Sequence, residues 1–460
     1  MPSSFGVLAA LSFAFPVLPP EILGYIFRLV CSEHDPTLRQ FRAACIRLSH
    51  VNRYWRAVAC AEPSLWRTLV VDDTTPPGYL DAFIEYSGHR PIAVAFALIR
   101  VFSPASRSPY CAPLVASAIR ILSSLHRWEA LELYIDHRDT MDALVSLFTD
   151  LRAPRLRYVS LTCREFSLTP TPTSHASPTS LFGPTLHSIR HITLDGVMLP
   201  PALASPMPLL VDLALDGIPS PFWPTYHAFI RLVAQSPSLR RICLNCVGFT
   251  GAPPVSSTLV SHILHFDISF GFGTLECGRS TLVLLASLVF SDLDSLRMAF
   301  RNTRAAAAFA ATSIVFNARR VCLEGPCTDI LVVRSIMARL HHVAALDLCH
   351  GHSAMLAALK PAHTVDSAIP LPSVASLRLY EPDWVALLDA LASRASASQT
   401  GIKELQCCIP RVRSYLKCTV PHVSYSDFPA FQQVLCLVDT FAWFEPTLPD
   451  NPLLISKYFT

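Results

Sequence analysis

The sequence predicts an α/β protein with a short module of three helices at the N-terminus, followed by an elongated array of repeats. The chain has 460 residues, which is too long for one ordinary hydrophobic core. A short motif of alternating apolar residues recurs through the middle of the chain, and each copy predicts one strand. Apolar residues at helical spacing precede that region and predict the helical module.

The composition indicates a folded protein and argues against one class of enzyme. Hydrophobic residues make up 51% of the chain and charged residues only 15%, a balance that supports a packed core. Glycine is scarce at 15 residues, which disfavours an enzyme built on phosphate-cradling glycine loops. Proline is frequent at 38 residues, as expected for many short connections between repeated elements.

The net charge limits the classes of partner that we expect, and the cysteine content indicates the cellular compartment. A net charge of +3 is too mild to predict nucleic acid or an anionic membrane as a partner. The 15 cysteines are odd in number and lie mostly in apolar runs, which predicts a cytoplasmic or nuclear protein with reduced thiols. The apolar stretch 5–18 leaves a secretory signal as an alternative, although no positive side chain precedes it and prolines follow it.

The recurring motif has an apolar residue, two others, an apolar residue, one other and a further apolar residue. Its best copy contains Ile189, Ile192 and Leu194, and a second contains Leu239, Ile242 and Leu244. Further copies centre on the pairs Leu131/Leu133, Val159/Leu161, Leu213/Leu215, Phe266/Ile268, Leu296/Met298, Val321/Leu323, Leu346/Leu348, Leu377/Leu379 and Leu405/Cys407.

Each copy predicts a short strand with one buried face, and the stretches between copies predict helices. The clearest helices are expected over 227–235 and 384–394. Successive strands lie roughly 21 to 33 residues apart, and the pattern resembles that of leucine-rich repeats. The resemblance implies an irregular leucine-rich-repeat solenoid, because the usual asparagine after the strand is missing. The alternative is a non-repeating α/β domain whose strands end in similar residues.

The predicted boundaries divide the chain into three parts. The helical module is expected over 15–73, the repeat solenoid over 91–408 and a C-terminal cap or tail over 409–460. The motif fades in the last part, which is aromatic and punctuated by prolines.

Two signatures mark the N-terminal module. The first is Leu18-Pro19-Pro20-Glu21-Ile22-Leu23 with Ile26-Phe27, and the second is the stretch 48–59, LSHVNRYWRAVA, followed by PSLWRTL over 63–69. Together they resemble the F-box domain, in the form common in mushroom-type fungal members. The resemblance covers about the first 70 residues.

The residues of these signatures suit short amphipathic helices. Pro20 and Glu21 are favourable in the first turn of a helix. An apolar face at helical spacing is formed by Ile22, Leu23, Ile26, Phe27 and Val30, and a second by Leu48, Val51, Trp55 and Val58 or Ala59. Two short helices cannot bury both faces on each other, so we expect a third element or a partner.

The resemblance implies that this partner is the Skp-type adaptor of a cullin ubiquitin ligase. It places an adaptor-binding set at Leu18, Pro19, Pro20, Ile22, Leu23, Ile26, Phe27, Leu48, Val51 and Trp55, of which the last three also hold the module together. The implied function is a substrate-recognition adaptor that binds the ligase core through the module and a protein target through the repeats. The alternative is a scaffold outside any ligase, whose N-terminal helices only cap the solenoid.

The predicted strands place alternate side chains on a concave surface that is able to hold the target. The N-terminal half of that surface leans acidic, and the candidate target-binding residues are Glu132, Asp195, Asp212, Asp216, Arg241 and Asp267. We expect a target with a basic segment around these residues. The alternative is a solvated face that needs no ligand.

No motif predicts catalysis, a metal or a cofactor. His137-Arg138-Asp139 lacks the asparagine that a kinase catalytic loop requires, and Cys243-Leu244-Asn245-Cys246 has no second cysteine pair at zinc-finger distance. The cluster of His341, His342, Cys349, His350 and His352 is divided by a predicted strand. We therefore expect no enzyme and no cofactor, the alternative being an enzyme whose site carries no known motif.

Overall fold

A computed structural model describes most of the chain. The described residues are 18–32, 38–98, 111–148, 151–163, 187–197, 207–253, 258–260, 262–270, 275–291, 293–326, 328–349, 352–360, 371, 373–380, 383–397, 401–408 and 428–444. All structural statements below refer to these residues.

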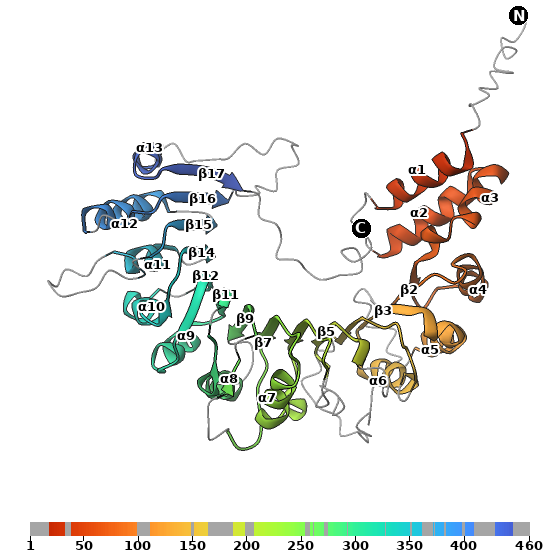
Figure 1. Cartoon of the computed structure of the whole chain (residues 1–460), viewed down its shortest axis with the longest axis horizontal. Coiled ribbons are helices and arrows are strands. Elements are labelled where there is room, and N and C mark those ends of the chain that lie inside the picture. Colours follow the sequence, from red (N-terminus) through yellow and green to blue (C-terminus); the bar gives the residue numbers. More distant parts are fainter. Residues whose placement is uncertain are drawn as a thin grey trace, which may run out of the picture.

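One curved sheet of 15 strands runs through almost the whole described chain. Its strands pair in parallel and in chain order, apart from β13, which pairs with β12 alone, and a separate two-stranded sheet joins β8 to β10 (Figure 1). The strands are β1 (Thr68–Val71), β2 (Ile92–Leu98), β3 (Trp128–Ile135), β4 (Tyr158–Cys163), β5 (His191–Asp195), β6 (Asp212–Asp216), β7 (Arg241–Asn245), β8 (Thr258–Leu259), β9 (His265–Phe270), β10 (Leu288–Val289), β11 (Leu293–Phe300), β12 (Phe316–Glu324), β13 (Leu340–His341), β14 (Ala345–Cys349), β15 (Ser376–Tyr380), β16 (Glu404–Cys408) and β17 (Thr440–Phe444).

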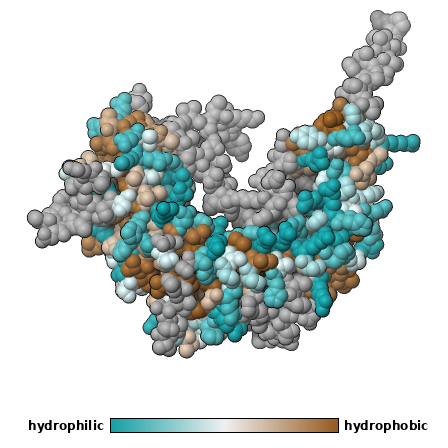
Figure 2. Space-filling model, in the orientation of Figure 1, coloured by the Kyte–Doolittle hydropathy of each residue, from teal (hydrophilic) through white to brown (hydrophobic). Residues whose placement is uncertain are grey.

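Helices cover the outer side of this sheet, and the N-terminal helices lie at one end of the arc (Figure 1). Figure 2 shows hydrophilic residues along much of the inner rim. The helices are α1 (Pro20–Ser32), α2 (Leu38–His50), α3 (Arg53–Ala61), α4 (Pro77–Tyr86), α5 (Ala112–Ile121), α6 (Arg138–Leu147), α7 (Tyr226–Ala234), α8 (Leu275–Ser287), α9 (Thr303–Ala310), α10 (Ile330–Met337), α11 (His352–Ala358), α12 (Trp384–Ala397) and α13 (Phe428–Cys436), with short 3-10 turns over 63–66, 122–127 and 220–222.

The expected strands are confirmed at each copy of the motif. On β5 and β6, Ile192 lies opposite Leu213 and Leu194 opposite Leu215, and all four side chains are buried. These apolar pairs continue from strand to strand and form one core between the sheet and the outer helices. The helices expected over 227–235 and 384–394 are also present, as α7 and α12.

The sheet extends beyond the limits 91–408 that the motif predicts. β1 lies before these limits, and β2 lies within them but contains no copy of the motif. Every residue in both strands is buried, so their sequences show no alternation of apolar and polar residues. At the other end, β17 continues the sheet by pairing with β16. Within the predicted tail, residues 428–444 form α13 and β17, and the remaining residues of 409–460 lie outside the described part of the chain.

Several strands are followed by a residue with positive φ, at the place where the leucine-rich-repeat pattern usually has an asparagine. The residue directly after the strand has positive φ at Gly196, Gly217, Cys246 and Gly325. Its N–H donates to a carbonyl of the next strand, as Gly196 does to Asp216 over 2.9 Å. These turns therefore extend the backbone ladder by one more hydrogen bond at each step.

Replacing Gly325 with alanine is expected to destabilise the repeat region by roughly 1–3 kcal/mol. The residue has φ +138°, and a Cβ there would collide with the backbone carbonyl of Phe300. Gly78→Ala is the matched control, because Gly78 lies in helix α4 with no atom near its added Cβ, and alanine favours a helix. Urea unfolding of the full chain measures both effects. Equal loss of stability in the two variants would contradict this account.

Candidate functional site

Helix α1 packs one face against the other two helices of the N-terminal module. Leu23, Phe27 and Cys31 recur every four residues on this face and are buried. The ring of Phe27 lies 5.1 Å from that of Trp55 on α3, and the Cys31 and Cys45 sulfur atoms are 3.6 Å apart. These contacts form the small core of the module.

The prediction that the residues from Leu48 to Ala59 form a second apolar face on one helix is wrong. Helix α2 ends at His50, and α3 begins at Arg53 after Asn52, whose side chain accepts a hydrogen bond from the N–H of Trp55 over 2.8 Å. This N-cap breaks the helix, so the predicted spacing is interrupted. Val51 lies in the break with 57% of its surface exposed and does not hold the module together.

Trp66 joins the module to the start of the sheet. Its indole N–H donates to the carbonyl of Ala59 at the end of α3 over 2.8 Å, and its ring lies 5.1 Å from that of Tyr86 on α4. Helix α2 also contacts β1, the first strand of the sheet. The module is therefore packed on the edge of the sheet, with α1 farther away from it (Figure 1).

The outer face of α1 is apolar as well, and it is exposed. Ile22 is 50% exposed and Tyr25 is 53% exposed, and the same surface includes Leu18, Leu29 and Val30. A helix that is apolar on both faces is normally buried on both, so this surface has the character of a binding face. Figure 2 shows hydrophobic residues at this free end of the molecule.

The structure separates the residues expected to bind an adaptor into two groups. Leu18, Pro19, Pro20 and Ile22 are exposed, and Ile26, Leu48 and Trp55 are half-buried. The placement of Leu23 and Phe27 at the docking surface is wrong, because both side chains are buried in the module core. Tyr25 and Leu29 were missed, although they follow Ile22 at three and seven residues, the spacing of one helix face.

The comparison with known families decides what this module is. Residues 15–72 match the F-box-like family. The match supports the prediction that this is an F-box domain protein. An F-box-like domain indicates a ubiquitin-ligase adaptor role in general, with a Skp-type adaptor as partner. No curated protein matches the chain. The exposed face of α1 therefore belongs to an F-box-like domain.

The inner face of the sheet carries the residues predicted to bind a target. On β5, β6, β7 and β9, alternate side chains point away from the core, as expected. Asp195 lies opposite Asp216 in the sheet, and both are half-buried. Asp212 pairs with His191, with 2.6 Å between its Oδ2 and the imidazole Nδ1.

The expected exposure of Glu132 is wrong, because only 5% of its surface is accessible. It lies opposite Ala95 and Ser160, which are buried too. On β2 to β4 the inner face is a second small core with Ala93 and Tyr158, so alternation along these strands does not produce an exposed side. Glu132 therefore does not offer a surface for a target.

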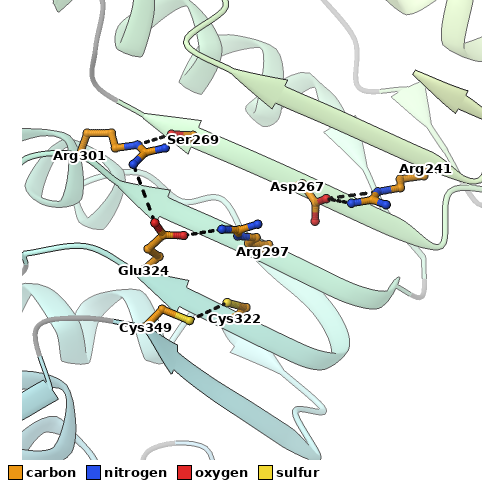
Figure 3. Close-up of polar contacts among 8 residues, drawn as sticks. All are labelled: Arg241, Asp267, Ser269, Arg297, Arg301, Cys322, Glu324 and Cys349. Atoms are coloured by element: carbon orange, nitrogen blue, oxygen red, sulfur yellow. Dashed lines mark hydrogen bonds and ion pairs between the residues drawn. The ribbon is translucent and has the colours of Figure 1, made fainter. Parts of the chain in front are cut away.

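Farther along the sheet, the charges of the inner face pair with one another across strands (Figure 3). Arg241 contacts Asp267 over 2.6 Å, and Glu324 contacts Arg297 over 2.7 Å and Arg301 over 3.8 Å. Burial lowers the pKa of Arg297, but the hydrogen bond and charge of Glu324 outweigh burial and raise that pKa above its usual value. Two of the predicted target residues, Arg241 and Asp267, thus neutralise each other.

The described residues form neither a metal-binding cluster nor a membrane-spanning helix. No group of three or more His, Cys, Asp or Glu side chains lies close enough to hold a metal ion, and His350 of the predicted cluster lies outside these residues. Among the helices described, none is long and apolar enough to cross a membrane.

Proposed function

We propose that the chain is the substrate-recognition adaptor of a Skp/cullin/F-box ubiquitin ligase. The observation that carries this proposal is the exposed apolar face of α1, formed by Leu18, Ile22, Tyr25, Leu29 and Val30 within the F-box-like match. A Skp-type adaptor bound there would remove this surface from water, which is the main favourable contribution to such an association. The cullin core would then be recruited through the adaptor.

The repeat region would hold the target. Its strands follow one another in chain order with apolar pairs in register, which supports an irregular leucine-rich-repeat solenoid. Such an arrangement presents a long concave surface for the target, and the chain itself would catalyse no reaction. We place this function in the cytoplasm or nucleus, where the reduced cysteines of the described chain suit the compartment.

The target is proposed to carry a basic segment that binds over β5 and β6. Asp195, Asp212 and Asp216 place three carboxylates on this part of the inner face, where the imidazole of His191 contacts Asp212 over 2.6 Å. The neighbouring region from β7 to β12 is different, because its arginines and carboxylates are interleaved. Charge complementarity therefore favours a basic segment at β5 and β6.

Reversing two of these charges tests the target site. Asp195→Lys/Asp216→Lys is expected to weaken binding of a fluorescent lysine-serine repeat peptide by at least about tenfold, as measured by anisotropy at low salt. The matched control is Asp73→Lys/Glu85→Lys, because both residues are exposed and lie away from these strands. Equal binding by the two double variants would contradict the placement of the site.

A second candidate function is a scaffold outside any ligase. The packing of Trp66 against Ala59 and Tyr86 favours it, because these contacts let the module close the edge of the sheet as a cap. Capping does not require the exposed apolar face on α1. Binding to a Skp-type adaptor therefore distinguishes the two functions.

A further inference from the structure

A notch interrupts the sheet where β12 meets β13 and β14. β12 pairs first with β13, Phe316 lying opposite Leu340, and then with β14, Arg320 lying opposite Ala345. The three residues between β13 and β14, His342 to Ala344, leave the ladder, and one backbone hydrogen bond of 2.8 Å from Ala344 to the Arg319 carbonyl spans the gap. A long strand thus pairs with two short ones, and a space opens at their junction.

The backbone at this junction adopts an unusual conformation. His342 has φ +59°, in the left-handed region that costs a residue with a Cβ atom free energy. The resulting pocket has a volume of 280 Å³. Its lining consists of Leu293, Asn317, Ala318, Arg319, His342 and Ala344. Strain of this kind gathers at binding sites, because the surrounding fold has to hold the residue in place.

Three polar side chains line the pocket, those of Asn317, Arg319 and His342. Arg319 and His342 are exposed, and within the described residues neither side chain has a hydrogen bond or an ion pair. Asp294 lies on β11 at the level of Arg319 on β12, yet no ion pair joins the two side chains among the residues described. The Asn317 amide is held by its hydrogen bond of 2.9 Å to the Ser291 carbonyl. Of the apolar residues in the lining, Leu293 and Ala318 are buried and belong to the hydrophobic core.

We propose that this notch binds a single oxyanion group, a carboxylate or a phosphate. The Arg319 guanidinium supplies the charge-assisted donors that such a group accepts, and the His342 imidazole offers a further N–H. A volume of about 280 Å³ leaves room for such a group with a small organic body attached, and for little more. The proposal does not depend on the ligase function, because Arg319 and His342 lie far along the chain from the F-box-like domain.

Thermal unfolding of the full chain tests the site, with inorganic phosphate and N-acetylaspartate as separate probes at constant ionic strength. Binding to the folded state raises the unfolding temperature with probe concentration. We expect a saturable rise for the wild type, and at least about a tenfold weaker response for Arg319→Gln, which loses a charge-assisted bond. His342→Gly should weaken it as well, because glycine tolerates the left-handed backbone but carries no imidazole.

Arg304→Gln is the matched control, because Arg304 is an exposed arginine in the first turn of α9, outside the pocket. It should respond to the probes as the wild type does. A response to phosphate alone identifies a phosphate site, and a response to N-acetylaspartate alone identifies a carboxylate site. The absence of a saturable rise in the wild type would overturn the proposal, as would an equal loss in Arg304→Gln and Arg319→Gln.

Discussion

Ile22→Asp/Tyr25→Asp should reduce the affinity of the chain for a Skp-type adaptor by at least about 100-fold, because docking would strip water from two carboxylates. Both side chains are about half exposed on α1, so the substitutions leave the module core intact. Biolayer interferometry with immobilised adaptor measures the loss. Circular dichroism of the same samples establishes that the variant remains folded.

The control for this prediction introduces the same charges on another apolar surface. Leu331→Asp/Val385→Asp changes two exposed side chains of α10 and α12, of which Leu331 is 75% exposed. The control variant should bind the adaptor as the wild type does. If both double variants lose binding alike, the effect is not specific to α1, and the docking face is misassigned.

Phe27→Ala should destabilise the F-box-like domain by about 3–5 kcal/mol, the range for removing a fully buried phenylalanine. The Phe27 side chain is completely buried and its ring contacts Trp55, so the substitution leaves a cavity in the small core of the module. Urea unfolding followed by tryptophan fluorescence measures the change. The control is Leu29→Ala on the exposed face of the same helix, which should cost no more than about 1 kcal/mol. A similar loss in both variants would mean that the two faces of α1 are assigned the wrong way round.

The repeat strands were predictable because their burial follows a simple rule. Where one face meets the helices and the other meets water, apolar and polar residues alternate, as in Ile192 to Leu194 on β5. The same rule explains the failures. β1 and β2 are buried on both faces, so alternation is absent, and Glu132 on β3 is covered although its position in the motif suggested exposure.

The candidate docking site was harder to predict than the fold. Both faces of α1 are apolar, and spacing alone cannot show which of them packs on α2 and α3. Leu23 and Phe27 were therefore grouped with Ile22, although the first two are buried and the third is exposed. The break before α3 did leave a signal, since Asn52 is a favourable N-cap residue at the position where the helix restarts.

The central claim is that this F-box-like domain binds a Skp-type adaptor through α1, and titration calorimetry of the full chain with purified adaptor tests it most directly. We expect saturable binding with a dissociation constant of about 1 μM or tighter. The heat capacity change should be negative, because Ile22, Tyr25 and their apolar neighbours leave water on docking. Absence of binding with the adaptor at about 100 μM would contradict the claim, and the module would then be a cap of the repeat array.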